Sequence, residues 1–326
     1  MAELTLLDAV NRALAHELAA DENVVLLGED IGLNGGVFRA TDGLQDRFGA
    51  GRVVDTPLAE SLIAGMTIGM AAQGLRPVAE IQFMGFIYPA LDQILNHASR
   101  LRTRTRGRLS CPMVLRAPFG GGIHAPEHHS ESTESMFAHI PGLRVVIPSS
   151  PARAYGLLLA SIRDPDPVIF LEPKRVYRML RQEVVDDGEA LPLDVCFTVR
   201  PGGDITLVSW GAMMHETLQA AERMEGEGID CEVIDVATIK PLDMETILES
   251  VQRTGRCVII HEAVRTAGFG AEVAANLAEH GLMSLFAPVV RVTGYDTVMP
   301  LHQLEHVYMP GTDRICAAVR QTMAYT

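Results

Sequence analysis

Residues 55–74 have the sequence Asp55-Thr-Pro-Leu-Ala-Glu60-Ser-Leu-Ile-Ala-Gly-Met-Thr-Ile-Gly-Met-Ala-Ala-Gln-Gly74. This segment carries the signals of a helix, because Thr56 can serve as the N-cap and Pro57 suits the first helical position. Beyond its first turn the helix has no charged residue, and a helix that is apolar on every side is typically buried. We therefore predict a buried helix with the carboxylate of Glu60 in its first turn.

Glu60 has two possible roles at this position. An acidic residue in a first turn can simply complement the positive end of the helix dipole. It can also be an acid reserved for chemistry, since an unpaired carboxylate in an apolar site is costly and needs a partner or a ligand. The segment by itself leaves both interpretations open.

Length and composition limit the class of protein. The 326 residues are enough for two ordinary domains. With 48% hydrophobic and 21% charged residues, the chain is globular and unusually apolar, which suggests large subunit interfaces or a large core. The net charge of −14 argues against nucleic acid or an anionic membrane as the main partner. We interpret the alternating arginines from Arg100 to Arg108 as a solvated or interfacial helix end.

The cysteines and the N-terminus point to a cytosolic protein. The five cysteines are far apart and form no C-x-x-C pair, so we expect reduced, mostly buried thiols and neither a zinc site nor a disulfide framework. No basic region followed by an apolar run opens the chain, and no segment is apolar for long enough to cross a bilayer. We expect a cytoplasmic location without membrane association.

Short apolar runs alternate with helical patterns along the chain. The expected strands are 23–28, 76–83, 111–118, 143–148, 167–172, 205–211, 231–236, 257–262 and 289–293. The expected helices include 6–20, one within 84–100, 151–163, one ending at 225, one from 243 and 270–280. This alternation predicts an α/β fold with a mostly parallel, doubly wound sheet. We expect a domain over residues 1–185, a linker over 186–204 and a smaller α/β domain over 205–326.

Candidate ligand-binding residues follow the expected strands. Glu29 lies just beyond the strand 23–28, at the carboxyl end where ligands gather in open α/β sheets. Phe83, Phe86 and Tyr88 cluster after the next strand along the chain. They are either ordinary core aromatics or flat surfaces on which a planar heterocycle could stack.

A glycine-rich loop over residues 119–132 contains His124, His128 and His129. Pro126 and the glycines oppose the helical spacing of an H-E-x-x-H zinc motif. Because the pKa of histidine lies near neutrality, a histidine on such a loop is better suited to act as a general acid.

Several motifs, taken together, resemble one known family over essentially the whole chain. They are Gly28-Glu-Asp-Ile-Gly32, Gly35-Gly-Val-Phe-Arg39, Asp55 to Glu60, Gly74-Leu-Arg-Pro77, Glu80-Ile-Gln-Phe83, the loop ending in His129-Ser130, Pro141 to Pro148 and Ile162 to Val168. The family is the beta subunit of thiamine-diphosphate-dependent 2-oxo acid dehydrogenases. The resemblance implies a transketolase-type pyrimidine-binding domain followed by a transketolase C-terminal-type α/β domain.

The resemblance also implies roles for individual residues. Glu60 would hydrogen-bond the aminopyrimidine ring of thiamine diphosphate and assist in its activation. Gln82, Phe86 and Tyr88 would line the pyrimidine pocket. His129 would assist transfer of the acyl group to a lipoyl arm. The enzyme would thus carry out oxidative decarboxylation of a 2-oxo acid and acyl transfer to a lipoyl acyltransferase core.

Metal binding would be divided between two subunits. In related enzymes a Gly-Asp-Gly motif holds the diphosphate through magnesium, and this chain has none. The resemblance therefore implies an alpha subunit that supplies this half, in an assembly of two alpha and two beta chains. It also implies a potassium site built largely from backbone carbonyls, which leave little trace in sequence. Its residues would be Met113, Ser161, Ile162, Asp164 and Asp166.

The substrate and some alternatives stay open. Glu172 to Arg178 and Thr254 to Gly270 resemble branched-chain 2-oxo acid dehydrogenases, whereas Asn34 to Gln45 and Phe119 to Glu127 resemble bacterial pyruvate dehydrogenases. An acetoin dehydrogenase beta subunit and a non-catalytic scaffold subunit remain alternatives. A nicotinamide-dependent oxidoreductase is disfavoured, because no G-x-G-x-x-G follows an expected strand.

Overall fold

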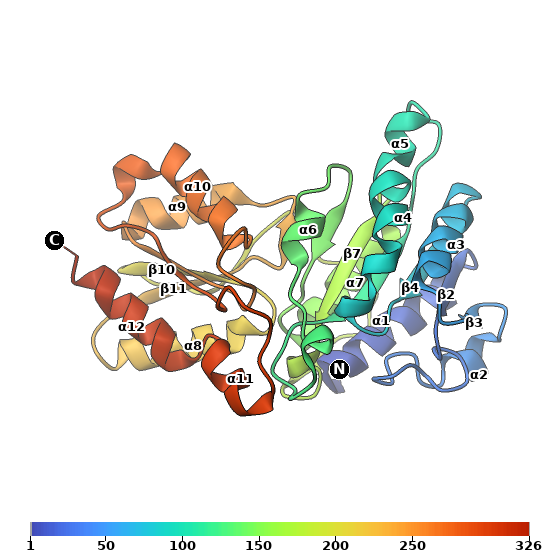
Figure 1. Cartoon of the computed structure of the whole chain (residues 1–326), viewed down its shortest axis with the longest axis horizontal. Coiled ribbons are helices and arrows are strands. Elements are labelled where there is room, and N and C mark those ends of the chain that lie inside the picture. The colour runs from blue at the N-terminus through green and yellow to red at the C-terminus, as the bar shows by residue number, and fades with distance from the viewer. Residues whose placement is uncertain (1, 326) are drawn as a thin grey trace. The chain divides into compact units, whose positions relative to one another are not determined.

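The computed structural model describes residues 2–325, which form two compact units (Figure 1). Unit 1 takes the chain up to Phe119 and Met136–Leu193. Unit 2 takes Gly120–Ser135 and the chain from Asp194 onward. The glycine-rich loop is thus part of unit 2, although the sequence places it within the expected first domain.

Unit 1 is built on a parallel sheet whose strands lie in the order β6-β7-β5-β4-β2-β3. The strands are β2 (Val24–Gly28), β3 (Val53–Asp55), β4 (Arg76–Glu80), β5 (Val114–Phe119), β6 (Arg144–Val146) and β7 (Val168–Pro173). Their central residues are buried, as expected for a parallel sheet that is covered on both faces. The predicted doubly wound α/β architecture is confirmed.

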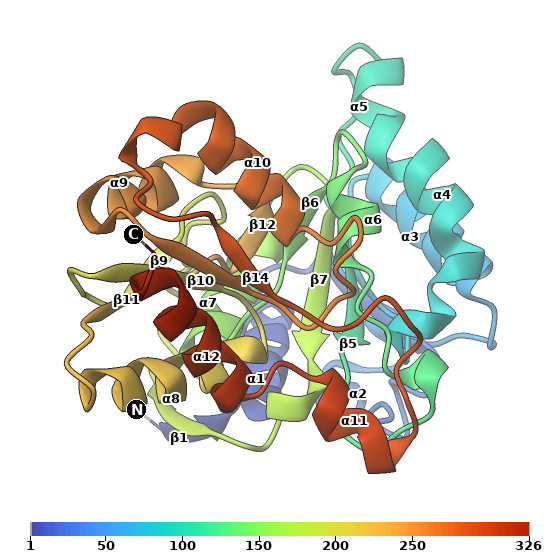
Figure 2. The same ribbon diagram turned by 60° about the vertical axis from the view of Figure 1, so that its left-hand side comes forward.

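Helices cover the two faces of this sheet (Figure 2). Helix α1 (Leu6–Ala20) packs against α7 (Pro151–Arg163), and both have the predicted bounds. On the other face, α3 (Glu60–Ala72) packs against α4 (Leu91–Asn96). The reversal of strand order between β6 and β7 puts α7 on the face opposite α3, as right-handed crossovers require.

The start of α3 differs from the prediction. Ala59, not Thr56, is the N-cap, and the helix begins at Glu60 itself. The backbone N–H of Thr56 instead donates to the carbonyl oxygen of Gly28 at 2.9 Å, so the chain stays extended beyond β3. Within residues 2–325, the hydroxyl of Thr56 has no partner. Glu60 nevertheless stands in the first turn, as predicted.

Helix α3 is also not fully buried in this chain. Leu62 and Met66 of the helix are 44% and 39% exposed, and Leu58, which precedes it, is 71% exposed. The prediction of a helix buried on every side is therefore wrong for the isolated chain. Leu58, Leu62 and Met66 form an exposed apolar surface, which we call the α3 face.

The other elements of unit 1 are short. The predicted helix within 84–100 is broken into several short turns, and after α4 the break lies at His97, whose φ of −120° and ψ of −60° are not helical. These turns are η1 (Met84–Phe86), η2 (Tyr88–Ala90), α4, η3 (Ala98–Arg100) and α5 (Leu101–Arg104). Further elements are α2 (Leu44–Phe48), η5 (Lys174–Val176) and the antiparallel pair β1 (Ala2–Thr5) and β8 (Arg181–Val184). The sequence did not indicate this strand pair.

Unit 2 has a second sheet in the order β14-β13-β10-β11-β9. Its strands are β9 (Phe197–Arg200), β10 (Ile205–Ser209), β11 (Cys231–Asp235), β13 (Cys257–Ile260) and β14 (Val290–Val292). All neighbours are parallel except β9, which pairs antiparallel with β11. Strand β9 lies within residues 186–204, where we expected only a linker.

Helices flank this second sheet on both faces (Figure 1). The helices are α8 (Met213–Glu225), α9 (Met244–Thr254), α10 (Gly270–His280), α11 (His302–Tyr308) and α12 (Thr312–Met323). Only the first three were expected. The remaining elements are η4 (Glu127–His129), α6 (Glu134–Ala138), β12 (Thr238–Lys240) and η6 (Leu282–Ser284). All five cysteines are free and buried, as predicted. Across residues 2–325, no helix has the length and apolarity needed to span a bilayer.

Candidate active site

Three predicted polar residues lie at the carboxyl edge of the unit 1 sheet. Glu29 follows β2, Glu60 begins α3 after β3, and Gln82 follows β4. Because β3, β2 and β4 are adjacent and parallel, their carboxyl ends meet at one edge of the sheet. The fold therefore brings these residues to the same region, where open α/β sheets bind ligands.

The two carboxylates interact with one another. Burial raises the pKa of Glu29, and the negative charges of Asp30 and Glu60 raise it further. Glu29, Glu60 and Gln82 are all half-buried, and within the described chain none has a hydrogen-bond or ion-pair partner. Half-buried polar groups without partners favour a ligand that donates hydrogen bonds.

An aromatic cluster stands beside these polar groups. The ring of Phe83 lies 5.4 Å from that of Phe38 and 5.7 Å from that of Phe86, both edge to face. Phe38 in turn contacts Tyr177 at 5.3 Å. Phe86 is half-buried and Tyr88 is 38% exposed. The predicted cluster is therefore partly core and partly accessible to a flat ligand.

A buried ion-pair network beneath this edge was not predicted. Arg116 donates to Glu80 at 2.9 Å and to both carboxylate oxygens of Glu172 at 2.6 and 3.0 Å. The hydroxyl of Tyr177 also donates to Glu172, at 2.6 Å. All four side chains are buried, and burial raises the pKa of Glu80 although Arg116 opposes this. The network joins β4, β5 and β7, and its only sequence signal is charge within apolar strands.

The histidine loop belongs to unit 2. His129 is half-buried in η4, where its backbone N–H donates to the carbonyl oxygen of Pro126 at 3.0 Å. Its ring lies 4.3 Å from the ring of His128. Over residues 2–325 no cluster of three or more metal-ligating side chains is found. Glu29, Glu60, Gln82 and Phe86 thus share unit 1, and His129 is carried by unit 2.

A second unpredicted cluster lies in unit 2, at the end of the loop. Trp210 Nε1 donates to the buried carboxyl of Glu134 at 3.4 Å, and the His261 ring stacks on Trp210 with centroids 5.2 Å apart. Burial raises the pKa of Glu134 to about 8, and burial lowers the pKa of His261 to about 3. Both residues are therefore neutral near pH 7.

The predicted potassium residues lie together in unit 1. They are Met113, Ser161, Ile162, Asp164 and Asp166. Two of their side chains are already paired, since Arg144 lies 2.9 Å from Asp164 and Arg102 lies 2.6 Å from Asp166. Arg76 donates to the carbonyl oxygen of Ile162 at 2.9 Å. The Met113 carbonyl oxygen likewise accepts the Val168 N–H at 2.9 Å, and the Ser161 hydroxyl donates to the Leu157 carbonyl oxygen at 2.7 Å. A cation at this set would therefore have to share carbonyl oxygens that already accept hydrogen bonds.

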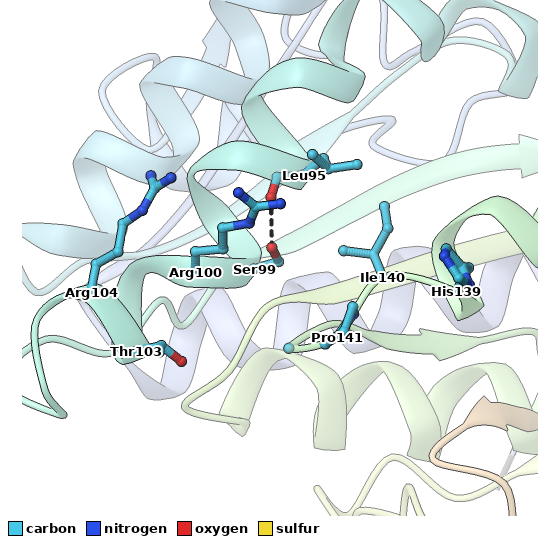
Figure 3. A pocket seen from close by; sticks show the side chains of 9 residues that line it. Leu95, Ser99, Arg100, Thr103, Arg104, His139, Ile140 and Pro141 are labelled. Carbon is cyan, nitrogen blue, oxygen red and sulfur yellow. Dashed lines mark hydrogen bonds between the residues drawn. The ribbon is translucent and has the colours of Figure 1, made fainter.

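The arginine run contributes to a separate cavity of about 460 Å³ in unit 1 (Figure 3). Arg100, Arg104 and His139 line it, and the hydroxyl of Ser99 donates to the carbonyl oxygen of Leu95 at 2.8 Å. Among the described residues that line this cavity none is a carboxylate, so it lacks the paired acids found at the carboxyl edge of the sheet.

Two family models together match nearly the whole chain. The model "Transketolase, pyrimidine binding domain" matches residues 2–179, and "Transketolase, C-terminal domain" matches residues 196–315. A solved "Split gene transketolase, inactive beta4 tetramer" has a TM-score of 0.82 at 23% identity, covering 99% of both chains. A transketolase from Pichia stipitis has a TM-score of 0.72 at 13% identity, covering 100% of this chain and 46% of that one. These structures share the fold.

Relatives of higher identity narrow the family. The chain is 46% identical to the pyruvate dehydrogenase E1 component subunit beta of Bacillus subtilis over 325 residues, or 100% of each chain. The subunit of the same name from Staphylococcus epidermidis is 47% identical over 100% of each chain. That of Acholeplasma laidlawii is 49% identical over 321 residues, or 98% of each chain.

The fold and its domains define a transketolase-type thiamine diphosphate protein. Within this class, the chain belongs to the beta subunits of 2-oxo acid dehydrogenases, the pyruvate dehydrogenase E1 family. It is therefore part of an oxidoreductase that uses thiamine diphosphate and has an alpha subunit as partner. The unpaired Glu29, Glu60 and Gln82, beside the accessible ring of Phe86, fit the polar edge and flat face of a pyrimidine.

Proposed function

We propose that this chain supplies the pyrimidine-binding half of an enzyme that oxidatively decarboxylates pyruvate and passes the acyl group to a lipoyl acyltransferase core. The observation that carries the proposal is the unpaired carboxylate of Glu60 at the start of α3, at the same sheet edge as Glu29 and Gln82. When bound, thiamine diphosphate supplies the electron sink that makes loss of carbon dioxide from a 2-oxo acid feasible.

Glu60 acts on the pyrimidine ring as a hydrogen-bond acceptor that can hold or return a proton. The negative charges of Glu60 and Glu29 repel each other. A ligand that donates hydrogen bonds to these two carboxylates would relieve this repulsion. Gln82 can both donate to and accept from the ring edge, and so orients it. Phe86 and Tyr88 line the face of the ring and exclude water.

His129 acts in the second half of the reaction. Its imidazolium can give a proton to the sulfur that leaves when the S–S bond of the lipoyl disulfide breaks and the other sulfur bonds to the acyl group, since histidine titrates near neutral pH. His129 lies in the short turn η4, within the glycine-rich loop.

The alpha subunit completes the cofactor site. It holds the diphosphate through magnesium, since this chain has no Gly-Asp-Gly motif, and it covers the α3 face. Two alpha and two beta chains form the enzyme. Potassium is held by backbone carbonyls of five residues, Met113, Ser161, Ile162, Asp164 and Asp166. Free, buried cysteines suit a bacterial cytoplasm.

Pyruvate is the substrate that the relatives favour, because the three described above are named pyruvate dehydrogenase subunits. The glycine motifs at Asn34 to Gln45 and Phe119 to Glu127 agree with this choice. The test is the ratio of kcat/KM for pyruvate and 3-methyl-2-oxobutanoate, measured on the complex co-expressed with its alpha subunit. A ratio that favours the branched acid would overturn the choice of substrate, and turnover of acetoin alone would overturn the proposed reaction.

Two variants of the same complex test the residue roles. Glu60→Gln should keep the assembly and lower decarboxylation by roughly 10² or more, the range of acid–base catalysis. His129→Ala should lower lipoyl acylation more than it lowers decarboxylation measured with an artificial electron acceptor. Unchanged turnover in Glu60→Gln would return Glu60 to the role of a helix-dipole partner. Normal lipoyl acylation in His129→Ala would show that His129 does not assist acyl transfer.

A further inference from the structure

The loop that carries His129 has a backbone that needs external support. Gly120 and Gly122 have φ of +84°, and His124 has φ of +60°, a region that side chains other than glycine rarely adopt. At the base of the loop the Gly120 N–H donates to the Glu131 carbonyl oxygen at 2.9 Å, and in its second half the Ser130 hydroxyl donates to the Pro126 carbonyl oxygen at 3.1 Å. Such a segment has high conformational entropy unless other groups hold it.

Two buried carboxylates from distant parts of unit 2 hold the first half of the loop. Glu262 accepts the Gly121 N–H at 3.1 Å. Glu305 accepts the Gly122 N–H at 2.7 Å with one oxygen and the His124 N–H at 3.1 Å with the other. Hydrogen bonds between an ionised acceptor and backbone donors are among the strongest in proteins.

The burial of these carboxylates makes the contacts costly to lose. Glu262 is 4% exposed and Glu305 is 3% exposed. A carboxylate removed from water must be compensated by donors, and for Glu305 those donors are loop amides. The His124 ring lies 3.5 Å from Glu305 but is 73% exposed, so it adds little. The energetic link therefore runs from the carboxylates to the loop backbone.

The glycines match the carboxylates sterically. A Cβ at position 120 would lie 2.2 Å from a carboxylate oxygen of Glu262, so any larger residue would displace that side chain. Glu262 is the second residue after β13, next to His261, and Glu305 lies on α11. Gly120 thus lets the loop backbone approach Glu262 closely.

We infer that Glu262 and Glu305 are positioning residues that fix the His129 loop for acyl transfer. The inference rests on the proposed role of His129. Holding a reacting group in its productive geometry is worth large factors in rate, and small misplacement costs roughly 10². Without the carboxylates the loop would sample many conformations and His129 would meet the acyl group less often.

The test is Glu305→Gln in the complex with the alpha subunit. The amide nitrogen of glutamine cannot accept a hydrogen bond, so one of the two loop N–H groups loses its acceptor. Amide hydrogen exchange in the peptide that contains residues 120–125 should become at least roughly tenfold faster. The ratio of lipoyl acylation to decarboxylation with an artificial acceptor should fall by roughly tenfold. Glu279→Gln, at an exposed position on α10, is the matched control.

Each outcome decides the inference. Wild-type exchange together with a wild-type ratio of the two rates in Glu305→Gln would overturn it, and so would faster exchange with an unchanged ratio. If Glu305→Gln fails to fold, Glu262→Gln provides the same comparison at the Gly121 N–H. If the wild-type complex does not act on 2-oxo acids, the proposed function fails, and exchange alone then decides whether the carboxylates hold the loop.

Discussion

Glu134 shows how one buried carboxyl group sets a pH dependence. Burial raises its pKa to about 8 in the folded protein, from an ordinary value near 4.5, and the Trp210 contact only partly compensates. Between these two pKa values the unfolded chain releases the proton while the folded chain keeps it. The free energy of unfolding therefore falls as the pH rises from about 4.5 to about 8.

Replacing this group should flatten that dependence. In Glu134→Gln no proton is released on unfolding, so the thermal midpoint should fall less between about pH 5 and about pH 8 than in wild type. Scanning calorimetry at several pH values measures this, with the exposed Glu279→Gln as control. Equal pH dependence in Glu134→Gln and wild type would contradict the burial of an uncharged carboxyl group.

At the residue scale, the sequence suggested candidate functional groups but indicated none of the long-range side-chain pairs. Glu60 and His129 were proposed from motifs that are contiguous in the chain, and their roles stay predictions. Arg116 and Glu172 are 56 residues apart, and Glu134 and Trp210 are 76 apart, so no local pattern joins them. These pairs depend on tertiary structure.

The strand-linking network around Arg116 gives a prediction at the scale of elements. Arg116→Ala should lower the free energy of unfolding by about 3–5 kcal/mol, because it removes the one cation that pairs with two buried carboxylates where β4, β5 and β7 meet. Urea unfolding followed by circular dichroism measures it. The half-exposed pair of Arg102 and Asp166 is the control, and Arg102→Ala should cost at most about 1 kcal/mol. Similar losses in the two variants would show that the buried network is dispensable.

Helix α3 gives a second prediction at this scale, because its exposed apolar face needs a cover. Leu62→Asp should leave the beta chain folded but weaken its association with the alpha subunit, since a charge would be buried at the contact. Sedimentation of the co-expressed complex measures this. The control is Met283→Asp, at a position that is 96% exposed in unit 2. A complex of normal stability in Leu62→Asp would exclude the α3 face as the alpha-subunit contact.

Element bounds could be predicted where the signals are local. The bounds of α1, α7 and α10 agree with the sequence, because apolar spacing is local and, for α1 and α7, Thr5 and Ser150 cap the first turn. The start of α3 was wrong, because a backbone bond from Thr56 to Gly28 keeps the chain extended. The pairing of β1 with β8 joins segments about 180 residues apart, which periodicity cannot detect.

At the scale of the whole molecule, several features indicate half of a site. Glu29, Glu60 and Gln82 lack partners within residues 2–325, the α3 face is exposed and apolar, and the chain has no Gly-Asp-Gly motif. The fold and the family could be predicted from sequence. The exposed α3 face could not, since composition does not distinguish a helix buried in its own chain from one covered by a partner.

The central claim is that the cofactor site is shared between two chains. The most direct measurement is titration calorimetry of thiamine diphosphate with magnesium, on the beta chain alone and on the complex co-expressed with the alpha subunit. We predict tight binding by the complex and none detectable by the beta chain alone. Tight binding by the beta chain alone would contradict the account, because this chain would then hold the diphosphate as well as the pyrimidine.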